Sequence, residues 1–101
     1  MPDRAYFLMS AATLIEKSKR VLRTGEIVER VVWFVPSPVP PSEHHFKYRL
    51  VLIRNGVRVV GYDNERGKGD HRHHHGVEAP YNFVSIEQLI ADFEADVTRE
   101  T

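Results

Sequence analysis

Residues 46–62 read FKYRLVLIRNGVRVVGY, two β-rich runs separated by Asn55-Gly56. Asn-Gly between two such runs predicts a type I′ hairpin turn, because both central residues of that turn need a positive φ. Side chains alternate between the two faces of a strand. We expect the core face to carry Phe46, Tyr48, Leu50 and Leu52. The opposite face has a cationic end and an apolar end, formed by Lys47, Arg49, Val51 and Ile53.

Upstream of this hairpin lies a second β-rich run, residues 27–35. It ends at residues 36–41, where four of the six residues are proline and cannot pair as a central strand. Residues 12–23 fit either a helical stripe or a strand that pairs with residues 27–35 through a glycine-containing turn. The β-rich run directly after the turn favours the strand. Residues 4–11 are compatible with a short N-terminal helix.

A helix is predicted from about Ser85 to Val97. Ser85 with Gln88 three residues later has the spacing of a capping box. Apolar residues then recur at helical spacing, at Ile86, Leu89, Ile90, Phe93 and Val97. Glu87, Asp92, Glu94 and Asp96 fall outside that stripe. We therefore expect a single α+β domain over residues 1–101, with a small antiparallel sheet of about four strands and the C-terminal helix packed on it.

The composition is that of a soluble globular protein, with 42% hydrophobic and 28% charged residues. There is no cysteine, which excludes a disulfide framework, a thiolate zinc site and a cysteine nucleophile. This absence fits a reducing compartment, and we expect a cytoplasmic protein. No run reaches the roughly 18 apolar residues of a transmembrane helix, so no membrane partner is expected.

The formal net charge is 0, but the charges are segregated along the chain. Residues 44–75 contain seven Lys or Arg and three acids, so their net charge is 7 − 3 = +4. Residues 76–101 contain one Arg and six acids, so their net charge is 1 − 6 = −5. The basic middle favours a phosphate or polyanion partner. An equally simple explanation is that the acidic tail folds onto the basic sheet.

The most unusual stretch is residues 61–75, which read GYDNERGKGDHRHHH. Polar groups at this density are costly to bury without partners, so we expect the run to lie at the surface, held in place by the strand before it. His44 and His45, beside the proline-rich segment, are expected to be solvated.

This run has the groups that metal-free cleavage of RNA requires. A general base takes the proton of the 2′-hydroxyl, a general acid protonates the leaving oxygen, and cations stabilise the charged phosphorane. Histidine suits the proton steps and arginine suits phosphate. If the stretch is extended, His71 and His73 lie on one side of the strand. The candidate catalytic residues are His71, His73, Arg72, Asp63 and Tyr62. The candidate substrate-binding residues are Arg66, Lys68, Lys47, Arg49 and Asn64.

Three other interpretations of the run remain open. The histidines with Asp63, Asp70 or Glu65 could bind a metal ion, although ligands so close in sequence rarely all reach one ion. Such a site would indicate a metal-dependent nuclease or an RNA-modifying enzyme. The basic sheet could be a non-catalytic module that binds nucleic acid or protein. The run could also be a solvated loop whose glycines occupy turn positions.

The string GYDNERGKGDHRH at residues 61–73 resembles the signature of TumE-like proteins, which are toxins of bacterial toxin–antitoxin modules. Weaker matches extend the resemblance over residues 12–97, nearly the whole chain. They include Val32-Trp33, the segment 46–50, Pro80-Tyr81 and the segment 83–89.

The resemblance implies a small antiparallel sheet with a C-terminal helix, and it favours the strand for residues 12–23. It also implies a cognate antitoxin, expected to be a DNA-binding repressor. Many small toxins of this make-up cleave mRNA, often on the ribosome. We therefore expect a metal-independent ribonuclease with no cofactor. The β-rich edge strands and Trp33 are compatible with a homodimer.

Overall fold

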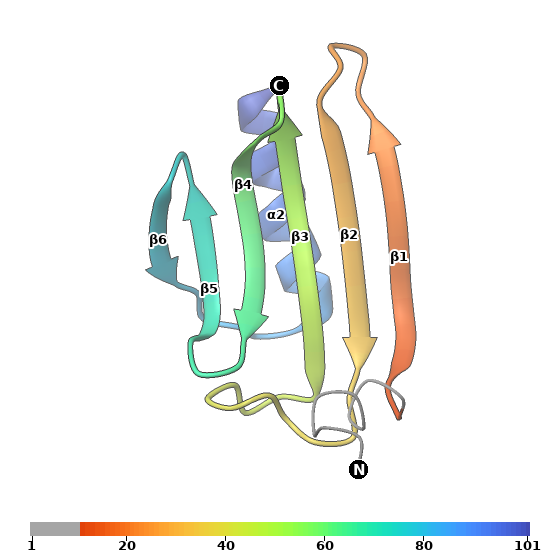
Figure 1. The fold of residues 1–101 in the computed structure, drawn as a ribbon, viewed down its shortest axis with the longest axis vertical. Helices are drawn as coiled ribbons and strands as arrows, with labels where there is room; N and C mark the ends of the chain where they lie inside the picture. Colours follow the sequence, from red (N-terminus) through yellow and green to blue (C-terminus); the bar gives the residue numbers. More distant parts are fainter. Residues whose placement is uncertain (1–10) are drawn as a thin grey trace.

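The computed structural model describes residues 11–101, which fold into six antiparallel strands and one helix (Figure 1). Each strand pairs with the next one in sequence, so the sheet order is β1-β2-β3-β4-β5-β6. The strands are β1 (Thr13–Val21), β2 (Ile27–Phe34), β3 (Phe46–Arg54), β4 (Val57–Glu65), β5 (Gly69–His74) and β6 (Val77–Pro80). Helix α2 (Ile86–Glu100) lies against one face of the sheet, behind its central strands in Figure 1. We call this face the helix face and the other the open face.

The predicted hairpin at Asn55-Gly56 is confirmed, with φ values of 52° and 76° at its two turn residues. The predicted strand count of about four was wrong. The two further strands are β5 and β6, joined by His75-Gly76 with φ values of 49° and 81°. Both of these residues have a positive φ close to that of the corresponding residue of Asn55-Gly56. Histidine is a less usual residue at such a position than asparagine, so the second hairpin has a weaker sequence signature.

The strand expected within residues 12–23 is confirmed as β1, which pairs with β2 along its length. The proline-rich segment 36–41 connects β2 and β3 without joining the sheet. The expected short helix over residues 4–11 falls almost entirely outside the described residues, and Ala11 lies in a turn.

The C-terminal helix begins where predicted and ends three residues later than Val97. Ser85 is its N-cap, with the Gln88 amide donating to Ser85 Oγ at 3.1 Å. The side chain of Gln88 donates to Asp92 Oδ1 at 2.8 Å instead of completing the capping box. Asp96 was expected outside the apolar stripe, but it is buried with Leu89, Phe93 and Val97.

The core lies between the helix face of the sheet and α2. Its buried apolar residues are Val28, Val32, Tyr48, Leu50, Leu52, Val59, Val60, Tyr62, Leu89, Phe93 and Val97. Within residues 11–101, no helix is long and apolar enough to cross a membrane.

Candidate functional site

The polar run at residues 61–75 forms the second half of β4, a turn, β5 and the start of the following turn. In the register of these strands Asp63 is opposite His71, and Tyr62 is opposite Arg72. Because neighbouring residues of a strand point to opposite faces, the run is divided between the two sides of the sheet. Asp63 and His71 lie on the open face, whereas Tyr62 and Arg72 lie on the helix face. The predicted catalytic residues are therefore not all brought together.

The expectation that the run lies at the surface was wrong for about half of it. The buried residues within it are Gly61, Tyr62, Asp63, Asn64, Gly69 and His71. Their burial is possible because the polar side chains among them find partners within the protein, as buried polar groups generally do. The turn residues of the run, 65–68, are exposed as expected.

His71 is only 4% exposed and lies between groups that accept hydrogen bonds. Its Nδ1 donates to the Gly69 carbonyl at 2.9 Å. Its Nε2 contacts the Asp63 carboxylate and lies 3.6 Å from Glu78 Oε1. Both nitrogens of the His71 ring therefore face groups that accept hydrogen bonds.

His73 is the neighbour of His71 on the same face of β5, with 5.0 Å between the ring centroids. Its partner differs in kind, because Arg58 Nη2 donates to His73 Nδ1 at 3.0 Å. A nitrogen that accepts from a guanidinium has no hydrogen, so Nε2 carries it in the neutral ring. Burial, and then the charge of Arg58, lower the pKa of His73. Both effects favour the neutral form of His73.

Arg58 reaches His73 because of two local features of β4. An extra residue at Val59 interrupts the pairing with β3, so that Arg58 and Gly61 both lie on the open face. The Arg58 side chain then crosses Gly61, where a Cβ atom would lie only 2.8 Å from Arg58 Cδ. Arg58 was not among the candidate residues predicted from the sequence. A glycine inside a strand was the available signal, since it often marks a close approach of another group.

Glu78 of β6 is the second functional candidate that the sequence analysis missed. It is opposite His73 in the register of β5 and β6. Its Oε2 lies 3.9 Å from His73 Nε2, and its Oε1 lies 3.8 Å from Lys68 Nζ. Lys68, His71 and Glu78 line a cavity of about 300 Å³ that opens between them. We call Asp63, His71, His73 and Glu78 the open-face cluster.

Lys47 and Arg49 of β3, two of the candidate substrate-binding residues, share the open face with this cluster. Arg49 is opposite Asp63 in the register and is exposed, 3.6 Å from Glu29. Lys47 is half-buried and donates from Nζ to the Asn64 carbonyl at 2.8 Å. Burial lowers the pKa of Lys47, an effect that Asp63 partly offsets. Arg66 and Lys68 are exposed in the turn between β4 and β5.

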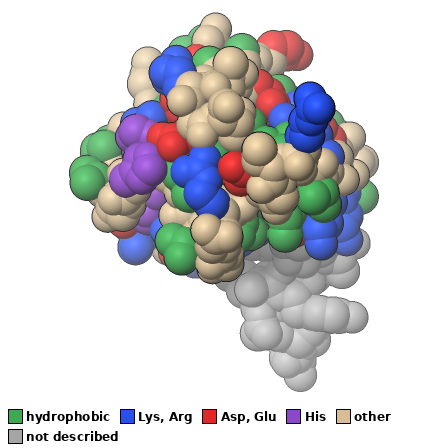
Figure 2. Space-filling view, turned by 90° about the horizontal axis from the view of Figure 1, so that it is seen from above, with side chains coloured by type: hydrophobic (Ala, Val, Ile, Leu, Met, Phe, Trp, Pro, Cys, Tyr) green, Lys and Arg blue, Asp and Glu red, His purple; other side chains and the backbone are tan. Residues whose placement is uncertain are grey.

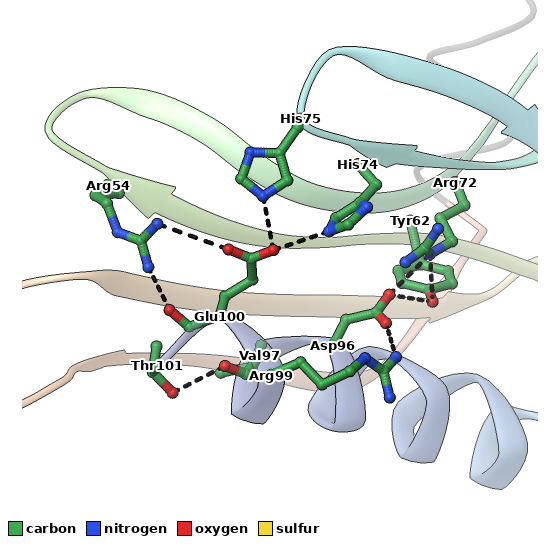
Figure 3. Close-up of polar contacts among 10 residues, drawn as sticks. All are labelled: Arg54, Tyr62, Arg72, His74, His75, Asp96, Val97, Arg99, Glu100 and Thr101. Carbon is green, nitrogen blue, oxygen red and sulfur yellow. Dashed lines mark hydrogen bonds and ion pairs between the residues drawn. The ribbon is translucent and has the colours of Figure 1, made fainter.

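Arg72 and Tyr62 bind the helix to the sheet (Figure 3). Arg72 Nε donates to Asp96 Oδ2 at 2.8 Å, and the Tyr62 hydroxyl donates to the same oxygen at 2.6 Å. Burial would raise the pKa of Asp96, but hydrogen bonds from Arg72, Tyr62 and Arg99 outweigh it and lower that pKa. These contacts give Arg72 and Tyr62 a structural role that requires no substrate.

Asn64 also makes contacts within the fold. Its Oδ1 accepts from the Tyr48 amide at 3.0 Å, and its Nδ2 donates to the Phe46 carbonyl at 2.7 Å. Asn64 is fully buried, and its side chain joins the end of β4 to the start of β3.

His44 was expected to be solvated, but the structure places it in a second network on the helix face. Its ring stacks on Phe83 at 3.7 Å between centroids. Its Nε2 lies 2.6 Å from Asp70 Oδ2, and its Nδ1 accepts from the Phe46 amide at 3.1 Å. Asp70 also accepts from the Tyr48 hydroxyl at 2.7 Å. Because both ring nitrogens have partners, we interpret His44 as a structural residue.

Two groups of side chains within residues 11–101 could hold a metal ion, each with its ligand atoms within 4.8 Å of one another. The first is Asp63 with His71 and His73. There the Arg58 guanidinium adds a positive charge and occupies His73 Nδ1, which opposes a cation. The second is His74 with His75 and Glu100, at the end of the molecule seen in Figure 2, where histidine side chains gather beside acidic ones.

A family model described as Toxin TumE matches residues 10–101. No curated protein matches the chain, and no solved structure does.

Proposed function

Because the chain belongs to the TumE family of toxins, we propose that it is the toxin of a type II toxin–antitoxin module and acts on RNA in the cytoplasm as a metal-independent ribonuclease. The family implies a cognate antitoxin. We propose that this partner is a DNA-binding repressor that neutralises the toxin.

The observation that carries the ribonuclease proposal is the pair of histidines in the open-face cluster. His71 and His73 lie side by side, but one faces two acceptors and the other accepts from an arginine. Two neighbouring rings with such different hydrogen-bond partners suit the separate roles of an acid and a base. We assign proton donation to the leaving oxygen to His71 and removal of the 2′-hydroxyl proton to His73.

The basic side chains around the cluster supply the phosphate contacts. Arg58 and Lys68 are next to His73 and Glu78, and both are exposed. A scissile phosphate that draws Arg58 away from His73 Nδ1 would also uncover the lone pair that the base needs. Arg66 and Arg49 would hold the flanking phosphates. Asp63 orients His71, and Glu78 balances the charge between the two histidines.

The test is cleavage of total RNA, with and without ribosomes, by the wild-type chain and a His73→Ala variant. We expect the variant to lose about 10²–10⁴-fold in rate, the usual contribution of a general acid or base. The matched control is His45→Ala, which removes an exposed histidine outside the cluster and should cleave like the wild type. Cleavage should survive EDTA. Equal rates for wild type and His73→Ala would refute the assignment.

A metal-dependent nuclease or RNA-modifying enzyme is the second candidate, and one observation favours it. Asp63 Oδ1 is buried and contacts His71 Nε2 without good hydrogen-bond geometry, and both residues belong with His73 to a group of possible metal ligands whose atoms lie within 4.8 Å of one another. Cleavage that EDTA abolishes and a specific ion restores would support this candidate. RNA binding without any product would instead support a non-catalytic binding module.

A further inference from the structure

A second cluster of chemically capable residues lies at the C-terminal end of β5, on the helix face of the sheet and therefore on the opposite side from the open-face cluster. His74 Nε2 and His75 Nε2 lie 2.8 Å and 2.7 Å from the same atom, Glu100 Oε1 (Figure 3). The two rings are 4.6 Å apart between centroids and 70° apart in plane. Three side chains from two separate elements, a hairpin and the helix end, therefore converge on one point.

Adjacent histidines would not normally reach the same point, because successive strand residues point to opposite faces. His75 does so because it is the first turn residue of the β5–β6 hairpin, with a φ of 49°. This left-handed conformation turns its side chain to the side on which His74 already lies.

Arg54 fixes the carboxylate that the two histidines share. Its Nη2 donates to the Glu100 carbonyl at 2.6 Å, and its Nη1 lies 3.7 Å from Glu100 Oε2. The Oε1 atom thus remains directed at the imidazoles. A partner behind a carboxylate that holds its ligating oxygen in place is a common feature of metal sites.

We propose that His74, His75 and Glu100 bind a divalent transition metal ion of the zinc class. Two imidazole nitrogens and one carboxylate oxygen are a donor set that suits Zn²⁺, Ni²⁺ or Co²⁺ and is poor for Mg²⁺. In the absence of a metal, the two Nε2 atoms must both donate a hydrogen to one oxygen. An ion between the three atoms replaces both hydrogens and leaves a coordination position open to solvent.

Such an ion would link the β5–β6 hairpin to the C-terminal end of α2. Because it binds only where these elements are together, it stabilises the folded chain by mass action. This site is separate from the open-face cluster, and the proposal does not depend on ribonuclease activity.

The experiment measures thermal unfolding of the full chain during titration with ZnCl₂, and with MgCl₂ as a control. We expect the Tm to rise with micromolar Zn²⁺ and not with Mg²⁺. Co²⁺ provides a second readout, since its visible d–d absorption intensifies when it enters a site of low coordination number. Absence of a Tm rise with Zn²⁺ would refute the proposal.

The decisive variant is His75→Asn. It removes one ligand but creates Asn-Gly, the preferred type I′ turn pair, so the metal-free fold should be at least as stable as the wild type. It should lose the response to Zn²⁺ and the Co²⁺ spectrum, as should Glu100→Gln. Arg54→Ala should weaken Zn²⁺ binding by about 10-fold, the lower end of what loss of an outer partner costs.

Two further variants locate the ion. His45→Asn removes a histidine elsewhere and should respond to Zn²⁺ like the wild type. Asp63→Asn removes a possible ligand of the open-face cluster and should also respond. A response lost in Asp63→Asn and retained in His75→Asn would place the ion at the open-face cluster and overturn the proposal.

Discussion

Arg72 lies between His71 and His73 in sequence, yet its guanidinium is on the other face of the sheet, bound to Asp96. The Asp96 side chain is only 2% exposed. Removing Arg72 would leave this carboxylate without its main cationic partner, and a buried polar group that loses its partner costs about 1–3 kcal/mol. Arg72 is therefore expected to matter for stability more than for the chemical step.

An Arg72→Met variant should accordingly lower the free energy of unfolding by about 1–3 kcal/mol, measured by urea denaturation. Where the variant remains folded, its rate of RNA cleavage should stay within about tenfold of wild type, far less than the loss expected for His73→Ala. A stable Arg72→Met protein without activity would return Arg72 to the catalytic residues.

Arg58 gives the opposite case, a residue that touches the proposed base. Arg58→Ala should slow cleavage by about 10²-fold, the lower end of what one charge-stabilising donor contributes. Gly61→Ala should act in the same direction with a smaller loss, because its Cβ would collide with Arg58 Cδ and displace the guanidinium from His73. Stability should change little, since the Arg58 side chain can move.

These two variants are compared by cleavage kinetics, with circular dichroism to establish that both remain folded. Full activity in both would show that the contact between Arg58 and His73 has no part in the reaction.

At the scale of elements, the sequence predicts the strands and the helix whose local residue pattern is strong. The hairpin at Asn55-Gly56 and the helix after Ser85 have turn or cap residues next to regular apolar patterns. Strands β5 and β6 do not. Gly69–His74 is polar, all residues of Val77–Pro80 are exposed, and their turn uses histidine where asparagine is preferred. They join the sheet because β5 pairs with β4 and β6 pairs with β5, which is a tertiary effect.

The candidate site, too, was predicted from the sequence only in part. Alternation correctly placed His71 and His73 on one side of a strand. Alternation could not predict what Arg72 and Tyr62 contact, because their partner is Asp96, a buried residue of the helix far along the sequence. Nor could it give Arg58 or Glu78. Arg58 depends on an extra residue in β4, and Glu78 on the register of a hairpin with a weak turn signal.

The contact of α2 with β4 and β5 gives a prediction about pH. The pKa of Asp96 is lower in the folded chain than in the unfolded chain, where an aspartate has a value of about 3.9. Its contribution to stability is therefore fully present above about pH 4 and is lost as the pH falls through the lower folded value. Asp96→Asn should be less stable than wild type at pH 7, and this difference should shrink in acid.

Urea denaturation of both proteins from pH 7 to pH 2 measures this difference. Control unfolding curves of Asp92→Asn, which removes a half-buried carboxylate of the same helix, show how much of the change is specific to Asp96. A constant difference between wild type and Asp96→Asn over the whole range would mean that the carboxylate is not held as described.

For the whole molecule, the formal net charge of 0 hides the uneven distribution of charge. The acids of α2 are largely paired with basic residues of the sheet: Glu94 with Arg20 and Arg30, Asp96 with Arg72, and Glu100 with Arg54. This pairing is the second explanation given for the charge asymmetry, that the acidic tail folds onto the sheet, and it applies to the helix face. It does not reach Arg49 or Lys68, which keep more than half of their side chains exposed at 53% and 56%.

RNA that binds the open face should therefore release its condensed counterions mainly where these exposed cations contact its phosphates. For a single strand, the slope of log K against log salt concentration changes by about 0.7 for each phosphate contact. Arg49→Ala and Lys68→Ala should each reduce the slope by about 0.7 and weaken binding with little dependence on the RNA sequence.

Arg23→Ala, in the turn after β1, is the matched control and should leave the slope unchanged. The measurement is RNA binding at several salt concentrations, in a His73→Ala background that prevents cleavage. An equal decrease in slope for Arg23→Ala and Arg49→Ala would mean that RNA does not select the open face, and the proposed cleavage site would lose its substrate track.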